Sequence, residues 1–263
     1  MSKVNALVLT GFGLNCDRET AHAFELAGAS SHCVHINALI DGSVRLEDHH
    51  VLVFIGGFGW GDDHGAGVVQ AVRFKTNLGD RILEFVDRGR LVLGICNGFQ
   101  ALVNLGLLPG FDGDYRSRSV ALTHNECGNF RNQWVRLNVD QDSPCIFTRG
   151  IQGADLPVRH GEGKFYAEEG VVRRLQQDHQ IVLRYALADG SPAAGRFPDN
   201  PNGSQHAIAG ICDISGRIFG LMPHPEAYLH RTNHPRWTRE ELPEEGMGLR
   251  LFTNAYQYLQ KRG

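Results

Sequence analysis

Short apolar runs alternate with helical segments over the first 105 residues, and this alternation limits the folds open to the chain. Four runs have the character of buried strands, at residues 6–10, 32–36, 51–55 and 91–95. Apolar residues recur at helical spacing over residues 17–27, 68–88 and 97–105. We expect the second of these helices to break at Gly79. Nearly continuous apolar strands are typical of a parallel sheet covered on both faces. The pattern therefore predicts an α/β fold with a mostly parallel central sheet and helices on both faces.

A different pattern follows Pro109, where strand-like runs are joined by turns. These runs lie at residues 134–139, 181–187, 207–213 and 217–222, and a closing helix is expected over 246–261. No internal repeat, low-complexity segment or long linker divides the chain, so we predict a single domain over residues 1–263.

The composition excludes several classes of protein. Hydrophobic residues make up 42% and charged residues 21% of the chain, which excludes global disorder. The net charge of −3 argues against a dedicated nucleic-acid binder. No run reaches the roughly 18 apolar residues of a membrane helix, and none resembles a secretory signal. We therefore expect a cytoplasmic protein with reduced cysteines. None of the six cysteines forms a C-x-x-C pair, which argues against a zinc ribbon.

The segment Gly94-Ile95-Cys96-Asn97-Gly98 joins a predicted strand to a predicted helix. G-x-C-x-G in this place is the cysteine form of the nucleophile elbow, in which a sharp turn leaves room only for small neighbours. Cys96 would lie at a helix N-terminus, where the dipole favours a thiolate. A glycine-flanked core cysteine fits the motif alone equally well.

A base for this nucleophile is predicted at His224, in the segment Pro223-His224-Pro225-Glu226. The prolines favour an extended segment, with His224 and Glu226 pointing the same way. One imidazole nitrogen could then face the thiol while Glu226 holds the other, as in a catalytic triad. A polar turn at the end of a strand is the simpler alternative.

Backbone amides for an oxyanion hole are predicted in the glycine-rich segment 55–62, which follows a buried strand. Acyl transfer needs N–H donors aimed at the developing negative charge. The N–H groups of Gly57 and Asn97 would provide them. A flexible loop after a strand is again the simpler alternative.

Two other kinds of site are not supported. The G-x-G at residues 11–13 has Cys16 where a dinucleotide fingerprint needs its third glycine, and we expect only a packing role for Cys16. His160 and Glu162 have no obvious further ligands at suitable spacing, so no metal is expected. No P-loop is present either, because Gly163-Lys164 is followed by Phe165.

Three segments together resemble the triad, or class I, glutamine amidotransferases: G-I-C-N-G-F-Q at 94–100, G-G-F-G-W-G-D at 56–62 and M-P-H-P-E at 222–226. Within this family, the chain is similar to the glutaminase subunits of phosphoribosylformylglycinamidine synthases. The further marks of that branch are N-C-D at 15–17, H-G-E-G at 160–163 and N-P-N-G-S at 200–204. The resemblance covers nearly the whole chain.

The resemblance implies a flavodoxin-like amidotransferase fold with a small additional antiparallel sheet. It implies that Cys96, with His224 and Glu226, hydrolyses glutamine through a thioester. Gln100 would help hold the substrate, and Asn125 and Phe130 match a looser substrate loop. The chain itself would bind no cofactor. Ammonia would pass to a synthetase subunit that uses ATP and Mg, with a small accessory subunit in some assemblies, in de novo purine biosynthesis.

Other readings stay open at this point. The segment 231–245 resembles part of a large, fused form of the enzyme, which leaves the composition of the complex undecided. The acceptor of the ammonia could differ. A cysteine hydrolase of protease or deglycase type commonly has histidine directly after its cysteine, where this chain has Asn97. A non-catalytic module would have no need for Cys96, His224 and Glu226 together.

Overall fold

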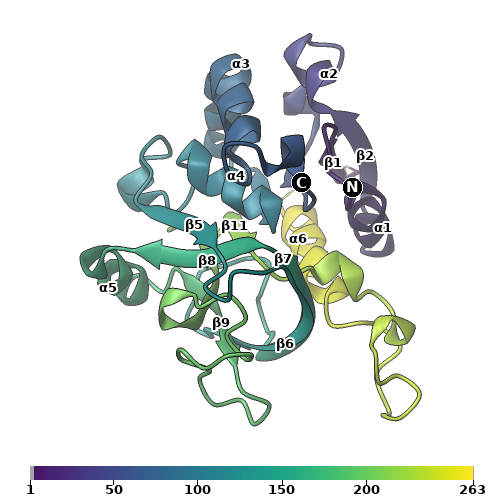
Figure 1. Ribbon diagram of the computed structural model, residues 1–263. Coiled ribbons are helices and arrows are strands. Elements are labelled where there is room, and N and C mark those ends of the chain that lie inside the picture. Colours follow the sequence, from purple (N-terminus) through teal and green to yellow (C-terminus); the bar gives the residue numbers. More distant parts are fainter. Residues whose placement is uncertain (1–2, 263) are drawn as a thin grey trace.

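The computed structural model describes residues 3–262, and a nine-stranded sheet runs through it (Figure 1). In spatial order its strands are β2 (Ser30–His35), β1 (Asn5–Thr10), β3 (Val51–Phe54), β4 (Leu91–Ile95), β11 (Ile218–Leu221), β10 (Ile208–Cys212), β9 (Ile181–Ala186), β6 (Arg131–Val139) and β7 (Gly153–His160). The strands from β2 to β11 pair in parallel, and those from β11 to β7 pair antiparallel. A separate two-stranded sheet pairs β5 (Val120–His124) with β8 (Glu162–Ala167).

Helices cover both faces of the parallel half. The helices of this half are α1 (Asp17–Leu26), α2 (Ile36–Ile40), α3 (Val68–Asp87), α4 (Asn97–Leu105) and α6 (Leu249–Gln260), while α5 (Glu169–Gln177) follows β8. Helix α1 packs with α6, and α3 packs with α4 on the other side of the strands (Figure 1). Every residue of β3 and β4 is buried, because both faces of these strands are covered. The carboxyl ends of the parallel strands therefore form the edge at which loops can carry chemistry.

The antiparallel half returns to this same edge. Strands β6 and β7 curve around in Figure 1, and β7 lies last in the order of the sheet. Nevertheless, the backbone N–H of His224, just after β11, donates to the carbonyl of Pro157 in β7 at 2.8 Å. The end of β7 therefore lies beside the ends of β4 and β11.

The predicted fold class is confirmed, including the small antiparallel sheet. The predicted break at Gly79 is wrong, because α3 is continuous from Val68 to Asp87 and its packing on the core outweighs the weak helix propensity of one glycine. Strands β5, β7 and β8 and helices α2 and α5 were not predicted. In β7 the apolar residues alternate with polar ones around Pro157, a residue that usually argues against a strand.

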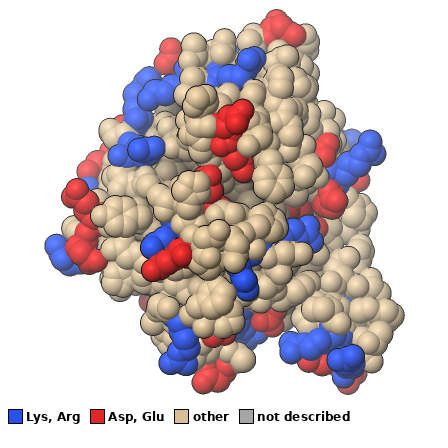
Figure 2. All heavy atoms as spheres, viewed as in Figure 1, with Lys and Arg blue, Asp and Glu red and all other residues tan. Residues whose placement is uncertain are grey.

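No helix in residues 3–262 is both long enough and apolar enough to cross a membrane. On the face shown in Figure 2, acidic side chains adjoin a depression near the centre, and side chains of both charges are mixed over the rest.

Candidate active site

Cys96 lies on the sharp turn between β4 and α4. Its backbone angles are φ 52° and ψ −109°, a combination that L-residues adopt only under constraint from their surroundings. Helix α4 also passes so close to β3 that a Cβ on Gly98 would overlap the carbonyl of Phe54. The sequence motif is therefore explained by the turn: only glycine fits at position 98.

The thiol of Cys96 faces a sheltered environment. The residue is 5% exposed, and its Sγ lies 3.6 Å from the carbonyl oxygen of Arg159, near the end of β7. It is the N-cap residue of α4, whose first N–H groups have no helical acceptor. The positive end of the helix dipole is therefore directed at the sulfur.

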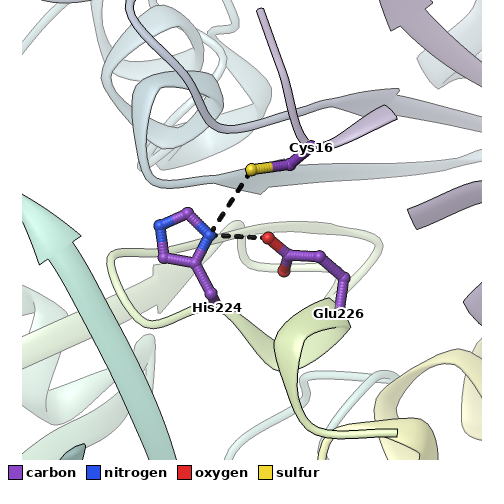
Figure 3. Close-up of side chains that lie close together, drawn as sticks. All are labelled: Cys16, His224 and Glu226. Carbon is purple, nitrogen blue, oxygen red and sulfur yellow. Dashed lines mark hydrogen bonds and ion pairs between the residues drawn. The ribbon is translucent and has the colours of Figure 1, made fainter. Parts of the chain in front are cut away.

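His224 and Glu226 form a buried, hydrogen-bonded pair. His224 Nδ1 lies 2.6 Å from Glu226 Oε1, and both side chains are almost fully buried (Figure 3). Since a carboxylate can only accept, Nδ1 carries the proton. The other nitrogen, Nε2, is buried and has no hydrogen-bond partner within residues 3–262. Nε2 is therefore free to accept or return a proton.

The segment around the base differs from the expected extended chain. His224 is extended, but Pro225–Ala227 forms a short 3-10 turn. Proline fits the first turn of a helix because its missing N–H would have no acceptor there. The turn brings Glu226 back toward the ring of its neighbour, and the two side chains still meet as predicted.

The charge balance at His224 favours the protonated ring. Burial by itself would lower the pKa of His224, but the charges of Glu226 and Cys96 outweigh it and hold that pKa well above its ordinary value. A protonated imidazole beside the cysteine suits a thiolate–imidazolium pair, which is the activated form of a cysteine nucleophile.

A second thiol lies at the same imidazole. Cys16, in the loop between β1 and α1, has its Sγ 3.9 Å from His224 Nδ1 (Figure 3). Burial is the main cause that raises the pKa of Cys16, so its thiol stays protonated at neutral pH. The sequence suggested only a packing role for Cys16. The sole signal for its position was its place after β1, at the same edge of the sheet.

Donor atoms of Cys16, His224 and Glu226 lie within 4.8 Å of one another, a spacing that would also suit a metal. However, His224 Nδ1 and Glu226 Oε1, two of the atoms that could ligate a metal, are already joined by the short hydrogen bond between them.

Of the two residues predicted to supply oxyanion amides, Gly57 lies in the loop after β3 and Asn97 is the first residue of α4. Neither the Gly57 nor the Asn97 N–H donates to an acceptor in the described part of the chain. Gly57 has φ 132°, and a Cβ there would lie 2.8 Å from backbone atoms of the loop after β1. Because position 57 is a glycine, the loop after β1 can lie directly against the loop after β3. Hydrogen bonds from Asn15 N–H to the Gly56 carbonyl and from Phe58 N–H to the Gly13 carbonyl join the two loops.

Two of the predicted substrate residues lie beneath the surface. Gln100 is buried, and its Nε2 donates to the carbonyl of Glu162 at 3.1 Å. The Asn125 amide nitrogen donates to the carbonyls of Asn129 and His160, while its oxygen lies 3.0 Å from His160 Nδ1. Burial lowers the pKa of His160 to about 3, so this ring is neutral. Gln100 and Asn125 therefore position the loops that surround the site.

Phe130 lies at the mouth of a hollow of about 330 Å3, here called the substrate hollow. Its lining residues are Phe58, Asp62, His124, Asn125, Gly128, Asn129, Phe130, Gly161 and Glu162. The rings of Phe58 and Phe130 are 6.0 Å apart, and both are about half exposed. Asp62 and Glu162 were part of recognised motifs but were not predicted as site residues.

Comparison with known proteins gives a consistent result. Residues 3–259 match the family model described as the CobB/CobQ-like glutamine amidotransferase domain. Two curated relatives bear the name phosphoribosylformylglycinamidine synthase subunit PurQ. The one from Dehalococcoides mccartyi is 47% identical over 99% of this chain and 100% of its own, and the one from Methanococcus maripaludis is 44% identical over 97% of each chain.

The solved structures add the fold. A chain of the structure titled PurLQS from Thermotoga maritima matches with a TM-score of 0.72 and 30% identity, over 98% of this chain and 100% of that one. A glutamine amidotransferase from the same organism matches with a TM-score of 0.52 at 17% identity, over 90% of this chain and 81% of its own, which bears on the fold alone.

Proposed function

The chain belongs to the CobB/CobQ-like glutamine amidotransferase family, and on this premise we propose that it is the glutaminase subunit of a phosphoribosylformylglycinamidine synthase. The observation that carries the chemistry is the elbow cysteine, whose side chain interacts with His224 of the buried His224–Glu226 pair. The names of relatives that match over nearly the full chain support the choice of pathway.

The proposed reaction begins with attack by Cys96 Sγ on the side-chain amide carbon of glutamine. The carbonyl oxygen gains negative charge, which the N–H groups of Gly57 and Asn97 stabilise. Protonated His224 gives its proton to the leaving nitrogen, so ammonia departs and a glutamyl thioester remains. Neutral His224 then takes a proton from water, whose oxygen attacks the thioester. Glutamate leaves and Cys96 is restored.

The ammonia has a proposed destination in a partner subunit. The partner synthetase would use it with ATP and Mg to convert formylglycinamide ribonucleotide to formylglycinamidine ribonucleotide. The similarity to a chain in an assembly titled PurLQS supports a synthetase partner and a small third subunit. We propose that this chain binds no cofactor of its own.

A cytoplasmic location is also proposed. All six cysteines are free thiols in the structure, whether buried or exposed. Free thiols are the rule in reducing compartments, where a purine-synthesising enzyme would find its substrates.

Glutamate release from glutamine tests the function. The purified chain is assayed alone and with its cognate synthetase, formylglycinamide ribonucleotide and ATP. We expect release in the complex, loss of release in Cys96→Ala and no change in Cys33→Ala, which alters an exposed cysteine on β2. The Cys96→Ala complex should still use added ammonia. Release without coupling would move the acceptor to another pathway, and no release at all would reject the glutaminase.

A further inference from the structure

The substrate hollow contains two acidic groups and no lysine or arginine. Asp62 and Glu162 line it, and no lysine or arginine is among its lining residues. Acidic side chains likewise adjoin the depression seen in Figure 2. Neither carboxylate has an arginine or lysine partner within residues 3–262. The hollow is therefore suited to a ligand that brings a positive charge.

Both carboxylates are fixed relative to the nucleophile. Asp62 Oδ1 accepts a hydrogen bond from Asn97 Nδ2 at 3.1 Å, and Asn97 directly follows Cys96. Glu162 Oε2 accepts one from the N–H of Ala66 at 3.0 Å, while its backbone carbonyl binds Gln100. Each carboxylate keeps its second oxygen for another partner: Asp62 Oδ2 has no hydrogen bond in the described chain, and Glu162 Oε1 lies 3.4 Å from the exposed ring of His124.

The environment of Asp62 disfavours the charge of this carboxylate. Burial and the charge of Glu162 raise the pKa of Asp62 to about 6. The charged form of Asp62 therefore lowers the stability of the protein without ligand, and a bound cation would offset this loss. Free glutamine has a cationic group, the α-ammonium, at the end of the molecule opposite its reacting amide.

We propose that Asp62 and Glu162 bind the α-ammonium group of glutamine, so that they select a free amino acid over other amides. This inference rests on the proposed function. Phe58 and Phe130 at the mouth would flank the methylene carbons of the substrate, which need apolar contact. The hollow would then select glutamine by its charge and by its carbon chain, since an amide that lacks an α-ammonium group leaves the two carboxylates unpaired.

The test compares glutamine with glutaramate, which is glutamine without its α-amino group. Kinetics are measured on the complex with its synthetase, for the wild type and for Asp62→Asn and Glu162→Gln. We expect each variant to raise the KM for glutamine by about 10-fold or more with a small change in kcat, because a charge-assisted hydrogen bond is lost. The KM for glutaramate should stay unchanged or fall, so the preference for glutamine should drop about 10-fold.

Asp63→Asn is the matched control, because Asp63 is an exposed neighbour that does not line the hollow. It should leave both KM values unchanged. Equal loss of kcat for glutamine and glutaramate in Asp62→Asn would overturn the proposal, since Asp62 would then serve only to position Asn97. An unchanged preference in both variants would overturn it as well. A wild-type complex that hydrolyses neither amide would instead reject the proposed function on which the inference depends.

Discussion

The sulfur of Cys16 and the imidazole of His224 are in contact: Sγ lies 3.9 Å from Nδ1, the nitrogen that also binds Glu226 at 2.6 Å. A Cβ placed on Gly56 would lie 2.7 Å from Cε1 of the same ring. Gly56 and Cys16 therefore both pack against the imidazole, and Glu226 fixes its rotation. We expect Cys16 to help position this ring.

Cys16→Ala should lower kcat for glutamine by about 3- to 10-fold, because misplacement of a general base slows proton transfer. The KM should not change, since Cys16 does not line the substrate hollow. Cys16→Ser, which keeps a side chain of similar size, should recover most of the rate. Steady-state kinetics of the complex measure both. Equal rates for all three proteins would show that the contact has no part in catalysis.

His224→Ala should slow alkylation of Cys96 by iodoacetamide at neutral pH by about 10-fold or more, because the thiolate loses the positive charge that stabilises it. Modification is followed by mass spectrometry of the peptide that contains Cys96. His22→Ala, an exposed histidine on α1, is the control. Alkylation that proceeds at the wild-type rate would remove His224 as the base.

Gly98→Ala should destabilise the protein by about 1–3 kcal/mol or more, because its new Cβ would overlap the Phe54 carbonyl. Gly79→Ala adds the same methyl group to a helix where nothing lies within 4 Å. It should stabilise the protein by about 0.5–1 kcal/mol. Urea denaturation measures both changes. If Gly98→Ala proved neutral, the close approach of α4 to β3 would not constrain the elbow.

The KM for glutamine should rise as pH falls through about 6, because protonation of Asp62 removes one of the two charges in the hollow. Glu162 from β8 and His124 from β5 are the titratable groups that share this wall. Asp62→Asn should flatten the dependence over pH 5–7. A profile in Asp62→Asn that still follows the wild type would assign the titration to another group.

Stability should show the opposite trend at the same residue. The folded-state pKa of Asp62 lies above its unfolded value of about 3.8, so the native form holds this proton more tightly. The stability contributed by protonated Asp62 is therefore lost as pH rises from about 4 through about 6. At pH 7, Asp62→Asn should stabilise the free protein by about 1 kcal/mol, a value reduced for the partial exposure of the side chain. Equal melting temperatures at pH 7 would contradict this.

The parallel half could be predicted because its signals are local. Buried strands, helix periodicity and the G-x-C-x-G turn each occupy a few adjacent residues, and they locate Cys96 and Gly57 without knowledge of tertiary contacts. His224 and Glu226 were likewise readable, because proline restricts their segment.

The remaining features depend on long-range contacts. Cys16 meets His224 across 208 positions of sequence, and Glu162 meets Ala66 across 96. The return of β7 to the active site depends on how the sheet curves, which no local pattern specifies. For the same reason the sequence predicts that Gln100 and Asn125 lie near the site, but it does not predict that their side chains bind the backbone of the surrounding loops.

The change from parallel to antiparallel pairing at β11 has a consequence for how such a protein can diverge. Cys96 and His224 follow strands β4 and β11, while Phe130 directly precedes β6 and Glu162 belongs to β8 of the separate two-stranded sheet. On the proposed assignment, mutations at Phe130 or Glu162 can alter which amide is admitted without moving the thiol or its base. Part of the substrate preference can therefore change by mutation during evolution, while selection keeps the nucleophile and its base unchanged.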